Sequence, residues 1–365
     1  MGRGIHTKSP QSGLIYTVGS GQDYATIAAA LADNYQCNGL ILNITDDRNE
    51  ALDLNDGNVG SATILGDNRE IVGITFEHGR SIYSSTINAG SGIAALSNSG
   101  NDITIAGSST NPDFDAEGIG NGDKLRIIDD SGNYTENTVS SSLNETITLT
   151  GTAPAVGGAG SSVTFVPNRK LYNSSSIPLL LSNNLLDLTI QGMSIETSGT
   201  AGIFTILLAF GVRLTLKNCV VSDFRTSGGF PTIRVEENAT LSAISECSVV
   251  KCLNTGIETF MGGVAFLNTI FVGKCGGLGV AAFDGGKLRT TGAKITHCEK
   301  GIFVSNARSY SPTTSTTKNN IGFWAGDSGR IHALGCSTLA SGNVTDFSPS
   351  SSDTEGNVDG YIKFS

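Results

Sequence analysis

Three acidic side chains, Glu236, Glu258 and Asp284, have the type and spacing that could support catalysis. Two carboxylates that face each other across a groove are the pair that hydrolyses a glycosidic bond, one as acid and one as base. The repeat positions of Glu236 and Asp284 put two strand steps between them, about 10 Å at ~4.8 Å per step. That separation lies just beyond the ~6.5–9.5 Å of an inverting glycosidase. Because acidic residues are common at turns, the pair is only a candidate, with Glu258 on the strand between them.

Nothing else in the sequence indicates a reaction centre. The four His are isolated, and none lies near Cys or carboxylate residues at metal-ligand spacing. The sequence contains no phosphate-binding glycine loop, no nucleophile elbow and no dinucleotide-binding fingerprint. It therefore predicts no metal and no cofactor.

The elements that would position these residues form a repeat over residues 177–341. A glycine followed by apolar residues returns at intervals of 21 to 27 residues. Between the glycines lie segments such as residues 214–219, in which polar and apolar residues alternate. Alternation is typical of half-buried strands, and a repeat of this length without a helical period predicts a β-solenoid. The glycines that begin the recurrences are Gly202, Gly229, Gly256, Gly277, Gly301 and Gly322.

Cysteines indicate the register of this repeat. Cys252, Cys275 and Cys298 follow one another at intervals of 23 residues. Small, apolar-tolerant residues stacked at one point of each turn suit the narrow interior of a solenoid. The seven Cys are therefore predicted to be buried thiols and not a disulfide framework.

In this repeat pattern, as in residues 218–221 and 298–302, the chain resembles the right-handed parallel β-helices of the pectate-lyase-like superfamily. Many bacteriophage tailspikes and other virion surface proteins have this fold. Residues 15–34 add to the resemblance, because a short helix with Ile27 and Leu31 on one face, N-capped by Asp23, would cover the open end of the stack. The resemblance implies a homotrimer. The Arg and Asp constellation with which pectate lyases hold Ca²⁺ is not recognisable, which argues against lyase activity.

We predict an all-β protein: a right-handed parallel β-helix with a small inserted antiparallel β-barrel or sandwich domain and a short N-terminal capping helix. The rung pattern stops near Asn101 and returns after Pro167, and residues 129–133 form a strong hairpin-turn signal. The Ser- and Thr-rich residues 309–320 are predicted to form an exposed loop. The predicted parts are an anchoring arm (1–13), the cap and first rungs including the apolar stretch 71–76 (14–101), the insert (102–167), the main β-helix (168–347) and a C-terminal tail with a capping strand (348–365).

The composition argues against two classes of partner. The formal net charge is −10, which disfavours nucleic-acid binding, and no basic cluster stands out along the sequence. No run approaches the ~18 apolar residues of a membrane span, and no signal peptide opens the chain. We expect synthesis in the host cytoplasm, no membrane insertion and a location on the virion surface.

Together these patterns predict a non-enzymatic structural protein of a bacteriophage-like particle, a trimeric capsid decoration (cement) protein or a short spike. The first 13 residues carry Arg3, His6 and Lys8 on an otherwise acidic chain and are predicted to bind capsid or tail proteins. Two alternatives stay open. One is a tailspike-type polysaccharide depolymerase, a glycoside hydrolase or lyase, that uses the three acidic residues of the repeat. The other is a host-recognition module that binds a surface polysaccharide through the insert without cleaving it.

Overall fold

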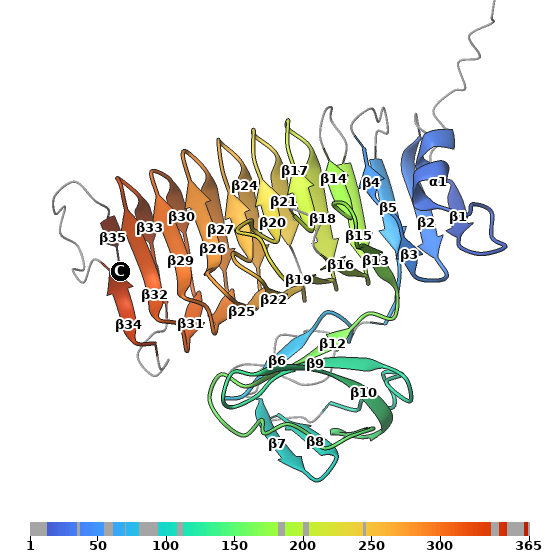
Figure 1. The fold of residues 1–365 in the computed structure, drawn as a ribbon, viewed down its shortest axis with the longest axis horizontal. Helices are drawn as coiled ribbons and strands as arrows, with labels where there is room; N and C mark the ends of the chain where they lie inside the picture. Colours follow the sequence, from blue (N-terminus) through green and yellow to red (C-terminus); the bar gives the residue numbers. More distant parts are fainter. Residues whose placement is uncertain are drawn as a thin grey trace, which may run out of the picture.

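The structure is a computed structural model that shows a long stack of strands with a smaller sheet beside it (Figure 1). The stack runs from the N-terminal helix at one end to the last strand at the other. The structure describes residues 13–34, 37–54, 61–69, 71–79, 94–107, 112–181, 187–199, 204–243, 246–336, 343–348 and 361–363.

Three parallel sheets form the stack, and each complete turn in its middle adds one strand to each sheet. Sheet A consists of β1 (Ile15–Val18), β2 (Asn38–Ile44), β5 (Ser61–Leu65), β15 (Asp187–Gln191), β18 (Arg213–Lys217), β21 (Thr240–Ala243), β24 (Val264–Asn268), β27 (Lys287–Thr291), β30 (Arg308–Tyr310), β33 (Arg330–His332) and β35 (Tyr361–Lys363). Sheet B consists of β3 (Arg48–Asn49), β13 (Lys170–Asn173), β16 (Ser194–Gly199), β19 (Val220–Arg225), β22 (Ser248–Cys252), β25 (Phe271–Cys275), β28 (Lys294–Thr296) and β31 (Ser315–Thr317). Sheet C consists of β4 (Leu52–Asp53), β14 (Leu179–Leu181), β17 (Ile206–Leu208), β20 (Ile233–Val235), β23 (Ile257–Thr259), β26 (Leu278–Phe283), β29 (Lys300–Ser305), β32 (Ile321–Gly326) and β34 (Thr345–Ser348). This architecture confirms the predicted parallel β-helix.

The interior consists of columns in which one residue type repeats from rung to rung. In sheet C, Ile206, Ile233 and Ile257 lie in register and are fully buried. In sheet B, Cys252 lies in register with Cys275, as the 23-residue interval predicted. Each large apolar side chain buried in this way contributes about 1.5–3 kcal/mol to folding. All seven Cys are free thiols; six are buried, as predicted, and Cys336 is half-buried.

A short helix covers the N-terminal end of the stack, as predicted. Ile27 and Leu31 of α1 (Ile27–Asp33) are buried against the first rungs. The N-cap is Thr26 and not Asp23, because the Thr26 hydroxyl accepts the Ala29 amide at 3.1 Å. The Asp23 carboxylate instead accepts the Thr17 amide and hydroxyl, each at 2.8 Å, and so fastens the preceding turn.

The inserted domain is an antiparallel sheet that curls over its own core (Figure 1). Its strands, in spatial order, are β6 (Thr75–Glu77), β12 (Ser162–Val166), β9 (Lys124–Ile128), β10 (Tyr134–Leu143), β11 (Thr146–Leu149), β8 (Asp102–Ala106) and β7 (Ala95–Ser99). The rings of Phe76, Phe114 and Phe165 meet in the core at centroid distances of 5.1–6.1 Å. Because β6 pairs with β12 in antiparallel fashion, the apolar stretch 71–76 belongs to this sheet and is not a rung. The insert therefore extends on the N-terminal side beyond the predicted residues 102–167.

The predicted exposed loop at residues 309–320 is instead part of a rung. It contains the end of β30 and all of β31, and the side chains of Ser311 and Thr314 are buried. Their hydroxyls are satisfied within the stack, Ser311 by Ser309 at 2.7 Å and Thr314 by Thr290 at 3.0 Å. The polar composition of these residues predicted an exposed loop. The hydroxyls of Ser311 and Thr314 can nevertheless be buried, because each forms a hydrogen bond with another hydroxyl and neither is left unsatisfied.

Candidate functional site

The insert packs against the outer face of sheet B. Ile128 at the end of β9 forms an apolar cluster with Val220, Val250 and Phe271 of three successive rungs. The Thr75 hydroxyl of the insert is 2.6 Å from the Ser248 hydroxyl of β22. These contacts fix the insert relative to the β-helix, so side chains from both parts can line one site.

A buried ion pair crosses the same junction. Arg126 of β9 is 2% exposed and donates to the Glu196 carboxylate of β16 and, at 2.7 Å, to the Ser222 hydroxyl. The second oxygen of Glu196 is 2.7 Å from the Lys170 ammonium. Burial alone would raise the pKa of Glu196, but the adjacent charges of Arg126 and Lys170 lower it to about 2. The carboxylate is thus ionised throughout the neutral range and orients the insert.

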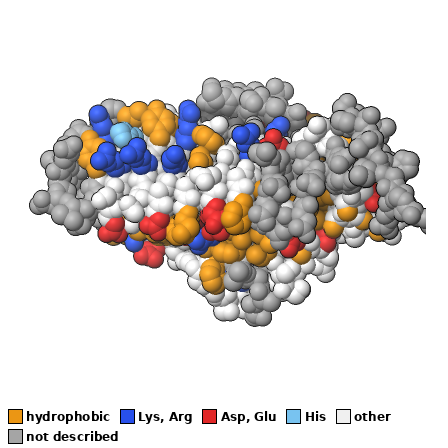
Figure 2. Space-filling view, turned by 90° about the horizontal axis from the view of Figure 1, so that it is seen from above, with side chains coloured by type: hydrophobic (Ala, Val, Ile, Leu, Met, Phe, Trp, Pro, Cys, Tyr) orange, Lys and Arg blue, Asp and Glu red, His pale blue; other side chains and the backbone are white. Residues whose placement is uncertain are grey.

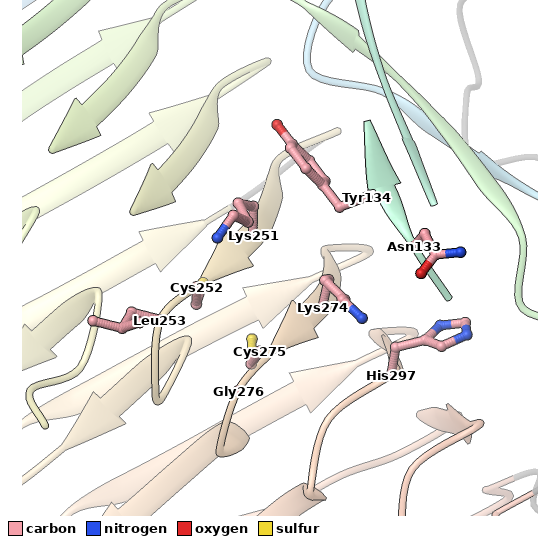
Figure 3. A pocket seen from close by; sticks show the side chains of 9 residues that line it. All are labelled: Asn133, Tyr134, Lys251, Cys252, Leu253, Lys274, Cys275, Gly276 and His297. Atoms are coloured by element: carbon pink, nitrogen blue, oxygen red, sulfur yellow. The ribbon is translucent and has the colours of Figure 1, made fainter. Parts of the chain in front are cut away.

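A cavity of about 440 Å³ lies between the hairpin of the insert and the β-helix (Figure 3). We call it the junction pocket. It is lined by Asn133, Tyr134, Lys251, Cys252, Leu253, Lys274, Cys275, Gly276 and His297.

Basic side chains of three successive rungs form one wall of the junction pocket. Lys251 of β22, Lys274 of β25 and His297 directly after β28 occupy matching positions and share a left-handed backbone, with φ of 61°, 57° and 53°. A left-handed residue other than Gly costs roughly 1–2 kcal/mol. In the part of the chain that the structure describes, neither lysine forms an ion pair. The stack therefore presents two amino groups to the pocket at a conformational cost.

The insert contributes Asn133 and Tyr134 to the lining of the pocket. The Tyr134 hydroxyl is buried and has no hydrogen-bond partner among the described residues, and burial raises its pKa. Asp129, at the tip of the hairpin, is near enough to Lys274 for their charges to interact, but its Oδ1 accepts the Ser131 and Asn133 amides at 2.9 and 2.8 Å. The pocket thus offers two amines, which suit a ligand with an anionic group.

His297 makes the junction sensitive to acid. Its ring lies against Gly132 and Gly160 of the insert, where added Cβ atoms would be within 2.6 and 3.0 Å of ring atoms. Burial, with Lys274 and Lys318 nearby, lowers the pKa of His297 from 6.5 to about 4.

Stability should therefore fall as the pH drops from about 6.5 to about 4, because the unfolded chain takes up a proton in this window and the folded chain does not. We expect His297→Gln to remove this component, about 1 kcal/mol at pH ~5 after allowing for solvent screening of a partly exposed ring. Urea midpoints of both proteins at neutral and acidic pH measure it. The same acid loss in both proteins would contradict it.

Of the three acidic candidates, the structure brings together Glu236 and Glu258, on the outer face of sheet C. Both bind Arg234, which donates from Nε to Glu236 at 2.7 Å and lies 3.0 Å from Glu258 through its terminal nitrogen. The guanidinium lies 4.5 Å from the Phe260 ring centroid. Burial raises the pKa of Glu258, with Glu236 adding to and Arg234 opposing that shift. The sequence patterns did not indicate Arg234 as a site residue, although it lies two residues before Glu236 and on the same outer side of sheet C.

Asp284 lies elsewhere, at the turn after β26 with φ of 44°. It aligns with Glu237 and Met261 in the turn column, as predicted, whereas Glu236 lies one position earlier. Its carboxylate accepts the Asn306 side-chain amide at 3.3 Å. Glu236 and Asp284, the pair predicted as candidates for an inverting mechanism, therefore lie at different positions of the turn and do not stack on each other.

The remaining predicted site residues lie in the arm. Arg3, His6 and Lys8 fall outside the described residues. Within the described residues, no group of three or more His, Cys, Asp or Glu side chains could hold a metal ion. No helix among the same residues has the length and apolar character to cross a membrane.

No protein-family model and no curated protein matches the chain. Ten solved chains align with it. Three of them are the tailspike gp49 of Pseudomonas phage LKA1 (10% identity over 82% of this chain and 67% of that one, TM-score 0.18), the tailspike gp61 of Pseudomonas phage phi297 (8%, 82% and 68%, 0.20) and the gp54 tailspike of Acinetobacter baumannii bacteriophage AP22 in complex with A. baumannii capsular saccharide (11%, 97% and 61%, 0.19). At such low TM-scores the likeness carries no argument about function, which has to come from the geometry of the chain itself.

Proposed function

We propose that this chain is a non-enzymatic virion surface protein whose junction pocket binds an acidic sugar of a host surface polysaccharide. The observation that carries the proposal is the stack of Lys251 and Lys274, two amino groups without an ion-pair partner in the described residues, at a cavity of about 440 Å³. A sugar carboxylate would accept from the two amines. The cavity has the size of a small-molecule site.

The chemistry of sheet C supports the non-enzymatic part of the proposal. Arg234 binds both Glu236 and Glu258, so both carboxylates have a role in an ion-pair network. One observation favours a depolymerase as the second candidate. The raised pKa of Glu258 beside Glu236 is the environment of a general acid.

The virion context is inferred from the parallel β-helix and its resemblance to phage surface proteins. Within the proposal, the chain is a trimeric capsid decoration protein or a short spike. An arm that contains Arg3, His6 and Lys8 attaches it to capsid or tail proteins.

We expect the double variant Lys251→Ala/Lys274→Ala to bind acidic sugars at least about tenfold more weakly, because each charge-assisted hydrogen bond contributes ~1.5–3 kcal/mol. Galacturonic acid and N-acetylneuraminic acid are the probes, measured by titration calorimetry, with galactose as the neutral comparison. Lys217→Ala, on the outer face of sheet A, is the matched control and should bind like the wild type.

Equal binding of galactose, or no effect of the double variant, would overturn the assignment of the pocket. In parallel, reducing ends are measured after incubation with acidic polysaccharide. Their release by the wild type and not by Glu258→Gln would replace the non-enzymatic proposal with the depolymerase.

A further inference from the structure

Sheet A carries a second basic surface near the C-terminal end of the stack. Lys287, Arg308 and Arg330 begin three successive strands and lie directly opposite one another in register. All three side chains are exposed. Because adjacent strands are ~4.8 Å apart, the column presents one cation at each rung along the axis of the β-helix.

A parallel column widens this surface. Arg289, Tyr310 and His332 lie in register two residues further along the same strands, and Lys363 of β35 continues this column. The guanidinium of Arg289 is 5.7 Å from the Tyr310 ring centroid. Seen from above, Lys and Arg side chains gather along one side of this face (Figure 2). We call the two columns the basic surface.

The first column borders a cavity of about 400 Å³. The lining residues are Gly285, Gly286, Lys287, Asn306, Ala307, Arg308, Ser328 and Arg330. Short polar side chains and backbone thus lie beside three cations, so an anionic group can enter the cavity and meet donors on more than one side.

The basic surface has no carboxylate partner among the described residues. Acidic side chains lie in a separate row at the turns between sheets C and A (Figure 2), and two of them bind neutral groups. Asp284 accepts from Asn306 at 3.3 Å and Asp327 accepts from the Ser305 hydroxyl at 2.9 Å. Like charges stacked at rung spacing repel one another. On a protein with a net charge of −10, an unneutralised basic column indicates an anionic ligand.

We propose that the basic surface binds a linear acidic polysaccharide along the axis of the β-helix, with its carboxylate or phosphate groups on the Lys287–Arg308–Arg330 column. A polymer is favoured because the cations repeat along a line over three rungs. A sugar chain is favoured over a single-stranded nucleic acid because base stacking needs free aromatic faces. Here Arg289 covers the Tyr310 ring, and His332 and Tyr361 contact each other edge to face at 6.5 Å.

This proposal does not depend on the junction pocket, because the two sites lie on different sheets and share no residue. The test is binding of immobilised protein to polygalacturonate, with neutral dextran and single-stranded oligo-dT as comparisons. We expect polygalacturonate to bind, to bind more tightly than oligo-dT, and to weaken as salt is added, since exposed charges are screened.

Arg308→Glu, in the middle of the column, should weaken polygalacturonate binding at least tenfold, whereas Arg308→Lys should retain most of it. Lys217→Ala, on the same sheet but outside the column, should bind like the wild type, and thermal melting confirms that each variant is folded. In a Lys251→Ala/Lys274→Ala background, Arg308→Glu should still weaken polygalacturonate binding by the same factor, which separates this proposal from that for the junction pocket. The proposal is overturned if polygalacturonate does not bind, if Arg308→Glu binds like the wild type, or if oligo-dT binds more tightly.

Discussion

Glu196→Ala should destabilise the protein by about 3–5 kcal/mol, because it leaves a buried guanidinium without its partner. Arg126 is 2% exposed and would keep the Ser222 hydroxyl at 2.7 Å, the partly exposed Glu136 at 3.5 Å and the Phe224 ring at 5.1 Å. The loss should be concentrated at the junction, since Glu196 is on the β-helix and Arg126 on the insert. Urea unfolding measures the total, and amide hydrogen exchange of β9 and β16 measures its location.

The matched control replaces both partners, as Arg126→Met/Glu196→Leu. A well-packed apolar pair of similar volume commonly equals or exceeds a buried ion pair in stability, so this double variant should lie near the wild type. A loss as large as that of Glu196→Ala would contradict the interpretation. The ion-pair contribution should also be present above pH ~4.5 and disappear as the pH falls toward the folded pKa of about 2. That window lies below the one expected for His297.

The repeat could be predicted from the sequence because equivalent positions on successive turns of a solenoid recur at nearly regular spacing along the chain. Cys252 and Cys275 were predicted to be in register and are. The positions of the recurring glycines were predicted only in part. Gly256 and Gly301 occupy the corner column between sheets B and C, but the member between them is Gly279 and not the predicted Gly277. A Cβ at Gly279 would lie 2.7 Å from the carbonyl oxygen of Gly301 on the next rung, and no local signal distinguishes two glycines so close together.

The two binding surfaces could not be predicted from the sequence, because their residues are far apart along the chain and become neighbours only when the rungs stack. Lys251 and Lys274 are isolated along the chain, as are Lys287 and Arg308, so a search for local basic clusters finds neither pair. Stacking at ~4.8 Å per rung brings them together. The start of the insert was missed for a different reason. An apolar run such as residues 71–76 suits a buried strand of either sheet, and its pairing partner, β12, lies far along the chain.

Gly192→Ala should also destabilise the protein strongly, by about 2–4 kcal/mol from steric overlap and left-handed strain together. Gly192 has a φ of 64°, and a Cβ at this position would lie 1.7 Å from the carbonyl oxygen of Asp67. The chain leaves the β-helix for the insert at this point, where the Asp67 amide donates to the Gly192 carbonyl at 2.6 Å. The methyl group would push the two backbones apart and loosen the root of the insert.

Gly211→Ala separates the two causes. Gly211 has a similar φ of 79°, but an added Cβ would meet nothing within 4 Å. It should therefore show only the left-handed strain, roughly 1–2 kcal/mol. Urea midpoints give the difference between the variants, and amide hydrogen exchange near Asp67 should rise in Gly192→Ala alone. Equal destabilisation by both substitutions would mean that the backbone at Asp67 yields without cost. The insert would then be held by its contacts with sheet B, the Arg126–Glu196 pair above all, and not by its point of exit.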